Sequence, residues 1–209
     1  MDVRRRILVS LCLLTLFAGP AAAQTPAARK LICFGDSITA GYGLASGQSY
    51  PDALQRNLNN LGYRYKVVNR GTSGATTKDA TASLRAILNE HPEVVIVEFG
   101  GNDGLRGLPL TQTKANLDSV VSALTAAHIK VLVAGITLPP NYGPQYTQQF
   151  DAIFPALAAK YHTALVPMIY KDLVNVPGTI QGDGIHPTAK GSEIIAKTLL
   201  PALKPLLTK

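Results

Sequence analysis

The sequence predicts an α/β protein, a three-layer α/β/α sandwich built on a flavodoxin-like parallel sheet of about five strands. Short apolar segments of strand type alternate with longer segments whose apolar residues recur at helical spacing, as in repeated β-α units. One segment, residues 94–99, is almost continuously apolar, as expected of a strand covered on both faces. The 209 residues are enough for one such domain with a sizeable core.

Each element has its own local pattern. The predicted strands lie at residues 31–34, 65–68, 94–99, 131–136 and 164–167. The first helix is expected at 50–61, because Pro51 suits a first helical turn and Gly62 suits its end. A second helix carries Leu84, Ile87 and Leu88 on one face. The remaining helices are expected at 111–127, 145–160 and 188–203, the last interrupted near Pro201.

This topology places every loop that follows a strand at one edge of the sheet. Ligands of open α/β sheets bind outside the carboxyl ends of the strands. The edge is therefore expected to collect the polar residues of four separate loops, namely Ser37, Gly74, Asn102 and the pair Asp183 and His186.

Residues 1–23 have the composition of a secretory signal peptide rather than of the domain, which is expected to span 24–209. Three arginines at 4–6 precede an apolar run at 7–18, and Ala21, Ala22 and Ala23 offer a cleavage site. The run is too short for a stable membrane-spanning helix. We therefore expect cleavage after Ala23 and a periplasmic or secreted protein.

Charge and cysteine content exclude several classes of protein. Cleavage would lower the formal charge from +7 to +5 and leave Cys33 as the one cysteine, so no internal disulfide is expected. The basic residues are scattered and not interleaved with aromatic residues, which argues against a nucleic-acid partner. The mild positive charge is compatible with transient contact with anionic membrane lipids. No histidine pair has zinc-ligand spacing, so no metal is expected.

The stretch Gly35-Asp-Ser-Ile38 follows the first strand, where a serine nucleophile would be well placed. Taken alone, the tripeptide Gly-Asp-Ser favours a simpler interpretation, in which Asp36 or Ser37 caps a turn or a helix. A serine hydroxyl becomes an effective nucleophile only when a base removes its proton. The nucleophile hypothesis therefore depends on partners supplied by later loops.

His186 is the candidate base, in the stretch Gly182-Asp-Gly-Ile-His-Pro187. Asp183 lies three residues earlier, a spacing that lets its carboxylate reach one imidazole nitrogen and leave the other for Ser37. The alternative is a loop histidine that caps the last helix. His91, His128 and His162 lie near predicted helix ends and are expected to have structural roles.

Acyl transfer also needs donors for the oxyanion. Gly74, in a loop of small and polar residues, allows a backbone N–H group to approach a substrate closely. Asn102 follows two glycines at the end of a buried strand, so its amide could point into the same space. A plain turn at Gly74 and a strand cap at Asn102 are the alternatives.

Four stretches in order resemble the four blocks of the GDSL-type lipolytic enzymes, also called SGNH hydrolases. They are Gly35-Asp-Ser-Ile38, Asn69-Arg-Gly-Thr-Ser-Gly74, Gly100-Gly-Asn-Asp103 and Asp183-Gly-Ile-His186. The resemblance covers essentially all of the chain after residue 30. It is greatest to the small periplasmic branch described as arylesterase, acyl-CoA thioesterase and lysophospholipase. Ile38 departs from the leucine of the family name, an apolar exchange expected to matter little.

The resemblance implies roles for these residues. Ser37 would be the nucleophile, His186 the general base and acid, and Asp183 its orienting partner. The oxyanion hole would be formed by the backbone N–H groups of Ser37 and Gly74 and the side chain of Asn102. Implied substrates are small-molecule esters or thioesters, and no cofactor is required.

Two loops are candidates for substrate binding. Leu105 and Leu108 follow Asn102 and could wall an acyl groove, as the corresponding loop does in the family. Tyr142 lies in the loop 138–144 after the fourth strand and could cover the other side. The alternative is that both loops are ordinary connections whose apolar residues pack down.

Three other functions compete with an exported ester and thioester hydrolase. A carbohydrate O-acetyl esterase on the same fold would prefer acetyl groups. A flavodoxin-like binding module would use glycine-rich loops to hold a phosphate or flavin, and it would not need the Asp183–His186 pair. A membrane-surface binding protein would need a basic amphipathic helix, which the sequence lacks.

Overall fold

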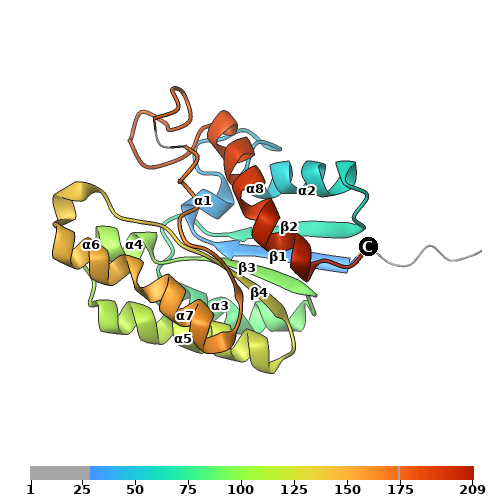
Figure 1. Ribbon diagram of the computed structural model, residues 1–209, viewed down its shortest axis with the longest axis horizontal. Coiled ribbons are helices and arrows are strands. Elements are labelled where there is room, and N and C mark those ends of the chain that lie inside the picture. The colour runs from blue at the N-terminus through green and yellow to red at the C-terminus, as the bar shows by residue number, and fades with distance from the viewer. Residues whose placement is uncertain (1–28, 174) are drawn as a thin grey trace, which may run out of the picture.

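A computed structural model describes residues 29–173 and 175–209 and confirms the predicted fold class (Figure 1). Five parallel strands form one sheet in the order β2-β1-β3-β4-β5, which is the flavodoxin-like order. The predicted signal peptide, residues 1–23, lies outside the described residues, so its cleavage stays a prediction. No helix in the described part of the chain is both long and apolar enough to cross a bilayer.

The strands agree with the predicted segments to within a few residues at each end. They are β1 (Arg29–Gly35), β2 (Tyr65–Gly71), β3 (Val94–Glu98), β4 (Lys130–Ala134) and β5 (Ala164–Val166). All five residues of the central strand β3 are buried, because helices cover both faces of the sheet. The valines and isoleucine of β3 therefore form the middle of the core.

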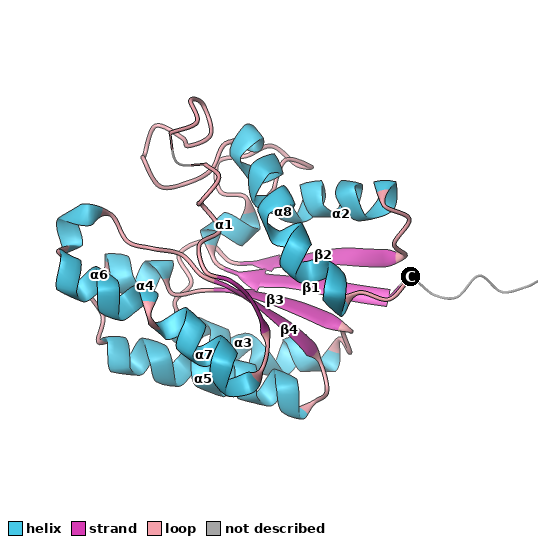
Figure 2. Cartoon of the chain, in the orientation of Figure 1, coloured by secondary structure: helices cyan, strands magenta, loops and turns pink. Residues whose placement is uncertain are grey.

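The helices form the two outer layers (Figure 2). One face of the sheet is covered by α2 (Tyr50–Asn60) and α8 (Ala189–Leu203), which pack together, with α1 (Ser37–Ala40) beside them. The other face is covered by α3 (Thr77–Asn89), α5 (Leu110–Ala126) and α7 (Ile153–Tyr161). Near the carboxyl ends of the strands lie α4 (Gly101–Leu105), η1 (Pro140–Tyr142) and α6 (Pro144–Asp151), and η2 (Lys204–Leu206) follows α8.

Two local predictions were wrong, and two short helices were missed. The single helix expected at 145–160 is two helices, α6 and α7, separated at Ala152. The expected interruption at Pro201 does not occur, because α8 continues through it to Leu203, which is fully buried. Burial of the Leu203 side chain compensates for the backbone hydrogen bond that Pro201 cannot donate. The short helices α1 and α4 were not predicted, because one helical turn has no periodicity to detect.

The three histidines expected at helix ends do lie there, in left-handed backbone. His91, His128 and His162 have φ angles of 49°, 58° and 52° and follow α3, α5 and α7. A residue in this conformation commonly terminates a helix. The three histidines therefore have a structural role, in ending helices where the chain turns. They lie away from the loops that follow β1, β2 and β3.

Gly71, at the end of β2, allows α1 to lie against the sheet. A Cβ atom at this position would lie 2.1 Å from the backbone nitrogen of Ala40. We expect Gly71→Ala to lower the free energy of unfolding by about 1–3 kcal/mol, because backbone cannot yield as a flexible side chain does. Urea denaturation measures this effect. The matched control is Gly182→Ala, where a Cβ atom meets no atom within 4 Å, and equal stabilities of the two variants would contradict the prediction.

Candidate active site

Ser37 is the first residue of α1, directly after β1. Asp36 caps this helix, since its Oδ1 atom accepts a hydrogen bond of 3.1 Å from the Ile38 backbone N–H. The Ser37 side chain therefore stands at the carboxyl edge of the sheet, where it remains 9% exposed. Thus Asp36 does cap a helix, as the simpler interpretation of Gly-Asp-Ser expected, and the same turn presents Ser37.

Ser37, His186 and Asp183 form a continuous chain of hydrogen bonds. The Ser37 Oγ atom lies 2.8 Å from His186 Nε2, and His186 Nδ1 lies 2.7 Å from Asp183 Oδ2. The other carboxylate oxygen of Asp183 accepts backbone N–H groups from Ile185 at 2.9 Å and from His186 at 3.0 Å. Donation from Nδ1 to Asp183 leaves Nε2 free to accept the Ser37 hydroxyl.

The loop hydrogen bonds keep Asp183 ionised. The backbone N–H of Ile185, the His186 side chain and the His186 backbone N–H together lower the pKa of Asp183 from 3.8 to about 2. Asp183 is therefore a carboxylate throughout the ordinary working pH range. A fixed negative charge beside Nδ1 stabilises an imidazolium if Nε2 takes a proton.

Three side chains hold the segment that carries Asp183 and His186. The Tyr170 hydroxyl donates to the Ile185 carbonyl oxygen at 2.9 Å. Gln181 Nε2 donates to the carbonyl oxygens of Tyr42 at 2.7 Å and Pro187 at 2.9 Å. The Tyr42 ring also lies against the His186 ring, with 4.6 Å between centroids. These contacts fix the imidazole over Ser37.

Gly74 and Asn102 reach the same region from the loops after β2 and β3. Gly74 has φ +80°, and its carbonyl oxygen accepts a hydrogen bond of 2.9 Å from Arg106. Asn102 Nδ2 donates to Asp36 Oδ2 at 3.2 Å and to the Ala75 carbonyl oxygen at 3.0 Å. Asn102 thus ties together the loops that follow β1, β2 and β3.

Two backbone donors remain available at this junction. Among the described residues, no acceptor is bonded to the backbone N–H of Ser37 or of Gly74. By contrast, both N–H bonds of the Asn102 amide already have protein acceptors. The three predicted oxyanion donors are therefore brought together, and Asn102 must share or exchange a bond to serve as one.

A pair of buried carboxyl groups lies beneath the serine. Asp36 and Glu98 are each 1% exposed, and Glu98 Oε2 accepts a hydrogen bond of 2.8 Å from Thr39. Burial raises the pKa of Asp36 from 3.8 to about 6, although the hydrogen bonds from Ile38 and Asn102 lower it. Burial and the neighbouring Asp36 charge raise the pKa of Glu98 well above its ordinary value.

Asp36 is expected to make the protein less stable as the pH rises. A folded-state pKa above the unfolded one gives stability that is present below pH 3.8 and lost as the pH passes about 6. One pKa unit corresponds to about 1.4 kcal/mol, so we expect wild type to lose about 2–3 kcal/mol relative to Asp36→Asn between pH 4 and 7. Urea denaturation across this range measures the difference. Parallel stability curves for the two proteins would contradict it.

An apolar cavity of about 310 Å³ lies beside the hydrogen-bonded chain. Gly101, next to Asn102, and Ile185, next to His186, both line it. The other lining residues are Leu105, Ile136, Thr137, Leu138, Pro139, Pro140, Met168, Tyr170 and Gly184. Apolar walls next to a few polar groups are typical of small-molecule sites.

The three predicted substrate-binding residues have different positions. Leu105 lines the cavity. Leu108 is 36% exposed, and Tyr142 is half-buried with its hydroxyl donating to the Leu105 carbonyl oxygen at 2.7 Å. Neither is among the residues that line the cavity. Tyr142 thus supports the wall to which Leu105 belongs.

Metal ligands are not gathered at this site. Within the described residues, no group of three or more His, Cys, Asp or Glu side chains is arranged to hold a metal ion. Asp183 and His186 are instead engaged with each other and with Ser37.

The four loops agree with a family pattern that spans the domain. The model of the GDSL-like Lipase/Acylhydrolase family matches residues 33–194, which include every residue of the site described above. The chain belongs to this family.

Individual members of the GDSL-like Lipase/Acylhydrolase family match nearly the whole chain. Esterase TesA of Pseudomonas aeruginosa is 44% identical over 205 residues, which are 97% of this chain and 100% of that protein. Thioesterase 1/protease 1/lysophospholipase L1 of Escherichia coli is 37% identical over 185 residues, 88% of each protein. A crystal structure of TesA superposes with a TM-score of 0.82 at 43% identity, covering 86% of this chain and 100% of that one.

Sequence reasoning missed several residues that organise this GDSL-like site. Glu98 offered a signal, because it is a charged residue inside the apolar run at 94–99. Tyr170 and Gln181 offered none, since their contacts with Ile185 and Tyr42 depend on how the segment after β5 folds back. The role of Asp36 in holding Asn102 likewise depends on the juxtaposition of two loops.

Proposed function

We propose that this protein is an exported serine hydrolase that cleaves carboxylic esters and thioesters through an acyl-enzyme. The observation that carries the proposal is the continuous chain from Asp183 through His186 to Ser37, at 2.7 and 2.8 Å. This arrangement couples a nucleophile to a base and the base to a carboxylate. Membership of a lipase and acylhydrolase family supports the same reaction class.

In the first half of the reaction, Ser37 Oγ attacks the substrate carbonyl carbon while His186 Nε2 accepts the hydroxyl proton. The imidazolium is stabilised by Asp183, whose low pKa keeps it ionised. Collapse of the tetrahedral intermediate breaks the bond to the leaving oxygen or sulfur, which takes the proton from Nε2. The products are a free alcohol or thiol and an ester between Ser37 and the acyl group.

In the second half, water attacks the acyl-enzyme by the same route. His186 accepts a proton from the water, and the new tetrahedral intermediate collapses when Ser37 Oγ departs with that proton. In both halves the backbone N–H groups of Ser37 and Gly74 stabilise the oxyanion. Asn102 adds an N–H donor by giving up its hydrogen bond to Asp36, which at 3.2 Å is the longer of its two.

The substrates we propose are aryl esters, acyl thioesters and lysophospholipids. The apolar cavity of about 310 Å³ next to Gly101 and Ile185 suits the acyl group. The names of the relatives, an esterase and a thioesterase/lysophospholipase, support these classes. The formal charge falls from +7 to +5 after the proposed cleavage and stays positive, so transient contact with anionic lipids is part of the proposal.

Export is proposed from the sequence of residues 1–23 alone. Cleavage after Ala23 would release the domain into the periplasm or the medium. Fractionation of cells that express the full chain, followed by N-terminal sequencing, tests this part independently of the chemistry.

The function is tested with p-nitrophenyl esters from acetyl to palmitoyl and with a fluorophosphonate that labels activated serines. We expect hydrolysis, stoichiometric inactivation and a covalent adduct located on Ser37 by peptide mass spectrometry. An optimum restricted to acetyl esters would favour the carbohydrate O-acetyl esterase instead. Absence of both hydrolysis and labelling would overturn the proposed function and favour the binding module.

A further inference from the structure

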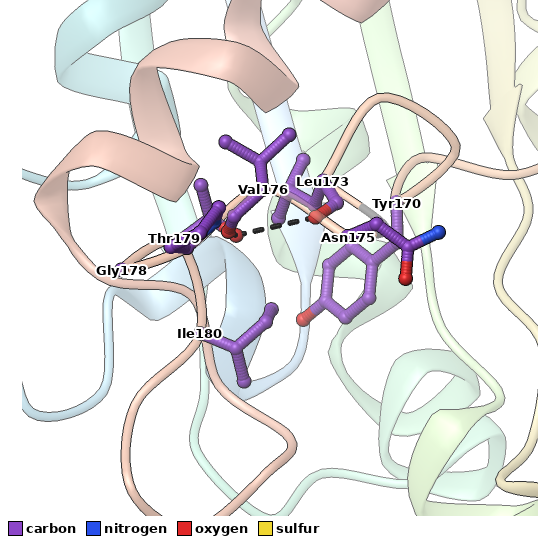
Figure 3. Close-up of a pocket in the computed structure, with 8 residues that line it drawn as sticks. Tyr170, Leu173, Asn175, Val176, Gly178, Thr179 and Ile180 are labelled. Atoms are coloured by element: carbon purple, nitrogen blue, oxygen red, sulfur yellow. Dashed lines mark hydrogen bonds between the residues drawn. The ribbon is translucent and has the colours of Figure 1, made fainter.

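A second cavity of about 390 Å³ lies next to the one proposed for the acyl group. Its lining residues come from one segment after β5 and are Tyr170, Leu173, Asn175, Val176, Pro177, Gly178, Thr179 and Ile180. Most of these side chains are apolar, and Figure 3 shows them around an open pocket, with Thr179 and Ile180 on the side opposite Tyr170. An apolar cavity of this size can hold part of a small hydrophobic ligand.

Among the described residues, Tyr170 is the one that lines both cavities. In Figure 3 its ring points toward Ile180 across the second cavity. On the side of the active site it borders the first cavity together with Met168 and Ile185. The half-buried Tyr170 ring therefore stands where the two spaces meet.

Hydrogen bonds hold Tyr170 both at its backbone and at its side-chain hydroxyl. Its backbone carbonyl oxygen accepts the Leu173 N–H at 2.9 Å, and its hydroxyl donates to the Ile185 carbonyl oxygen at 2.9 Å. Burial raises the pKa of Tyr170, so the hydroxyl remains a donor over the whole working pH range. A ring fixed in this way acts as a rigid wall, unlike a flexible chain such as that of Met168.

We propose that Tyr170 is a specificity-determining residue that closes the acyl cavity and so limits the length of the acyl chain. The inference rests on the proposed ester hydrolase function. The occupant of the first cavity is the acyl chain of the substrate, and its distal methylene groups meet the Tyr170 ring. Without this ring the chain would continue into the second cavity, toward Val176 and Ile180.

The volumes of the two cavities agree with a limit on the length of the acyl chain. Ligand pockets usually measure about 300–1,000 Å³, so the first cavity, of about 310 Å³, lies at the lower end of that range. Joining it to the second cavity, of about 390 Å³, would more than double the space available to the chain. Wild type should therefore prefer short and medium acyl groups, in lysophospholipids as well as in aryl esters and thioesters.

The test compares kcat/KM for p-nitrophenyl butyrate, octanoate, laurate and palmitate in wild type, Tyr170→Phe and Tyr170→Ala. Because one methylene group in an apolar pocket changes kcat/KM by about tenfold or more, we expect Tyr170→Ala to raise the laurate-to-butyrate ratio at least about tenfold. Tyr170→Phe keeps the ring and removes only the hydroxyl, so its ratio should stay within about twofold of wild type. This control separates closure of the cavity from support of the His186 loop.

A substitution in the second cavity completes the design. Val176→Phe alone should leave the ratio unchanged, whereas the Tyr170→Ala, Val176→Phe double variant should return it to the wild-type value. If Tyr170→Ala does not fold, as judged by circular dichroism, Tyr170→Leu replaces it with the same expected direction and a smaller shift.

Two outcomes would overturn the inference. One is an equal change in kcat/KM for every chain length when the ring is removed. The other is a double variant that behaves like the single Tyr170 variant. Either result leaves the proposed function intact, because wild type still hydrolyses the esters, whereas a wild type without esterase activity defeats the proposed function itself.

Discussion

The Ser37→Ala variant is expected to lose at least about 10⁴-fold in kcat on p-nitrophenyl butyrate. Removing the nucleophile of a serine hydrolase leaves only the catalysis supplied by substrate binding and the oxyanion donors. Here the Ser37 Oγ atom is the group that lies 2.8 Å from His186 Nε2. Within the described residues no other hydroxyl is hydrogen-bonded to His186 Nε2, so no other side chain is expected to replace the nucleophile.

The measurement is steady-state hydrolysis with a burst experiment at high enzyme concentration. Wild type should release a burst of p-nitrophenol if deacylation is slow, and Ser37→Ala should release none. The matched control is Ser83→Ala, because Ser83 is an exposed serine of α3 whose hydroxyl donates to the Asp79 carbonyl oxygen within its own helix. A Ser37→Ala variant that keeps a tenth of the wild-type kcat would contradict the assignment.

The Asp183→Asn variant is expected to lower kcat by roughly 10⁴-fold, while the protein remains folded. The new amide can still accept the backbone N–H groups of Ile185 and His186 through Oδ1. Its NH₂ group would then face His186 Nδ1, which must become the acceptor. The proton moves to Nε2, and the imidazole can no longer accept a proton from Ser37.

Stability and activity must be measured on the same preparation of Asp183→Asn. Urea denaturation should give a midpoint close to that of wild type, since the Asp183 side chain is 38% exposed and its backbone hydrogen bonds survive. The control is Asp118→Asn, on α5, which loses a surface ion pair with Lys160. Full activity in Asp183→Asn would show that the carboxylate does not orient the base.

The low pKa of Asp183 has a further consequence for acid inactivation. This carboxylate is stabilising above its ordinary pKa of 3.8, and the contribution disappears only as the pH falls through about 2. Activity lost on acidification to pH 5 therefore cannot arise from Asp183. The buried Asp36 has the opposite sign, because its ionisation above pH 6 destabilises the fold.

The sequence predicted the fold and the proximity of the site residues for clear physical reasons. The near-continuous apolar run at 94–99 identified a buried parallel strand, and parallel strands align their following loops. That rule alone brought Ser37, Gly74 and Asn102 to one edge. The Asp183–His186 spacing was also decisive, because a carboxylate three residues before a histidine can bond both its ring and its backbone.

What could not be predicted depends on contacts between segments far apart in the chain. The two bonds of Asn102 to Asp36 and Ala75 require the final positions of three loops. The cavity beside Ile185 depends on the return of the segment after β5, which has little periodic structure. Leu108 was predicted to bind substrate because it is apolar. Whether an apolar side chain is buried depends on its neighbours, and in the structure Leu108 is exposed to solvent.

The site consists of two parts that are held in place by different contacts. Nucleophile and backbone donors belong to the sheet edge, where Asn102 joins three loops into one block. Asp183 and His186 belong to a separate segment, attached through Tyr170 and Gln181. Local unfolding of that segment would move His186 away from Ser37 and abolish activity, while the hydrogen bonds of the sheet stayed intact. Activity therefore depends on the packing of one peripheral segment against the sheet edge. A spectroscopic signal from the sheet would not detect the loss of that packing.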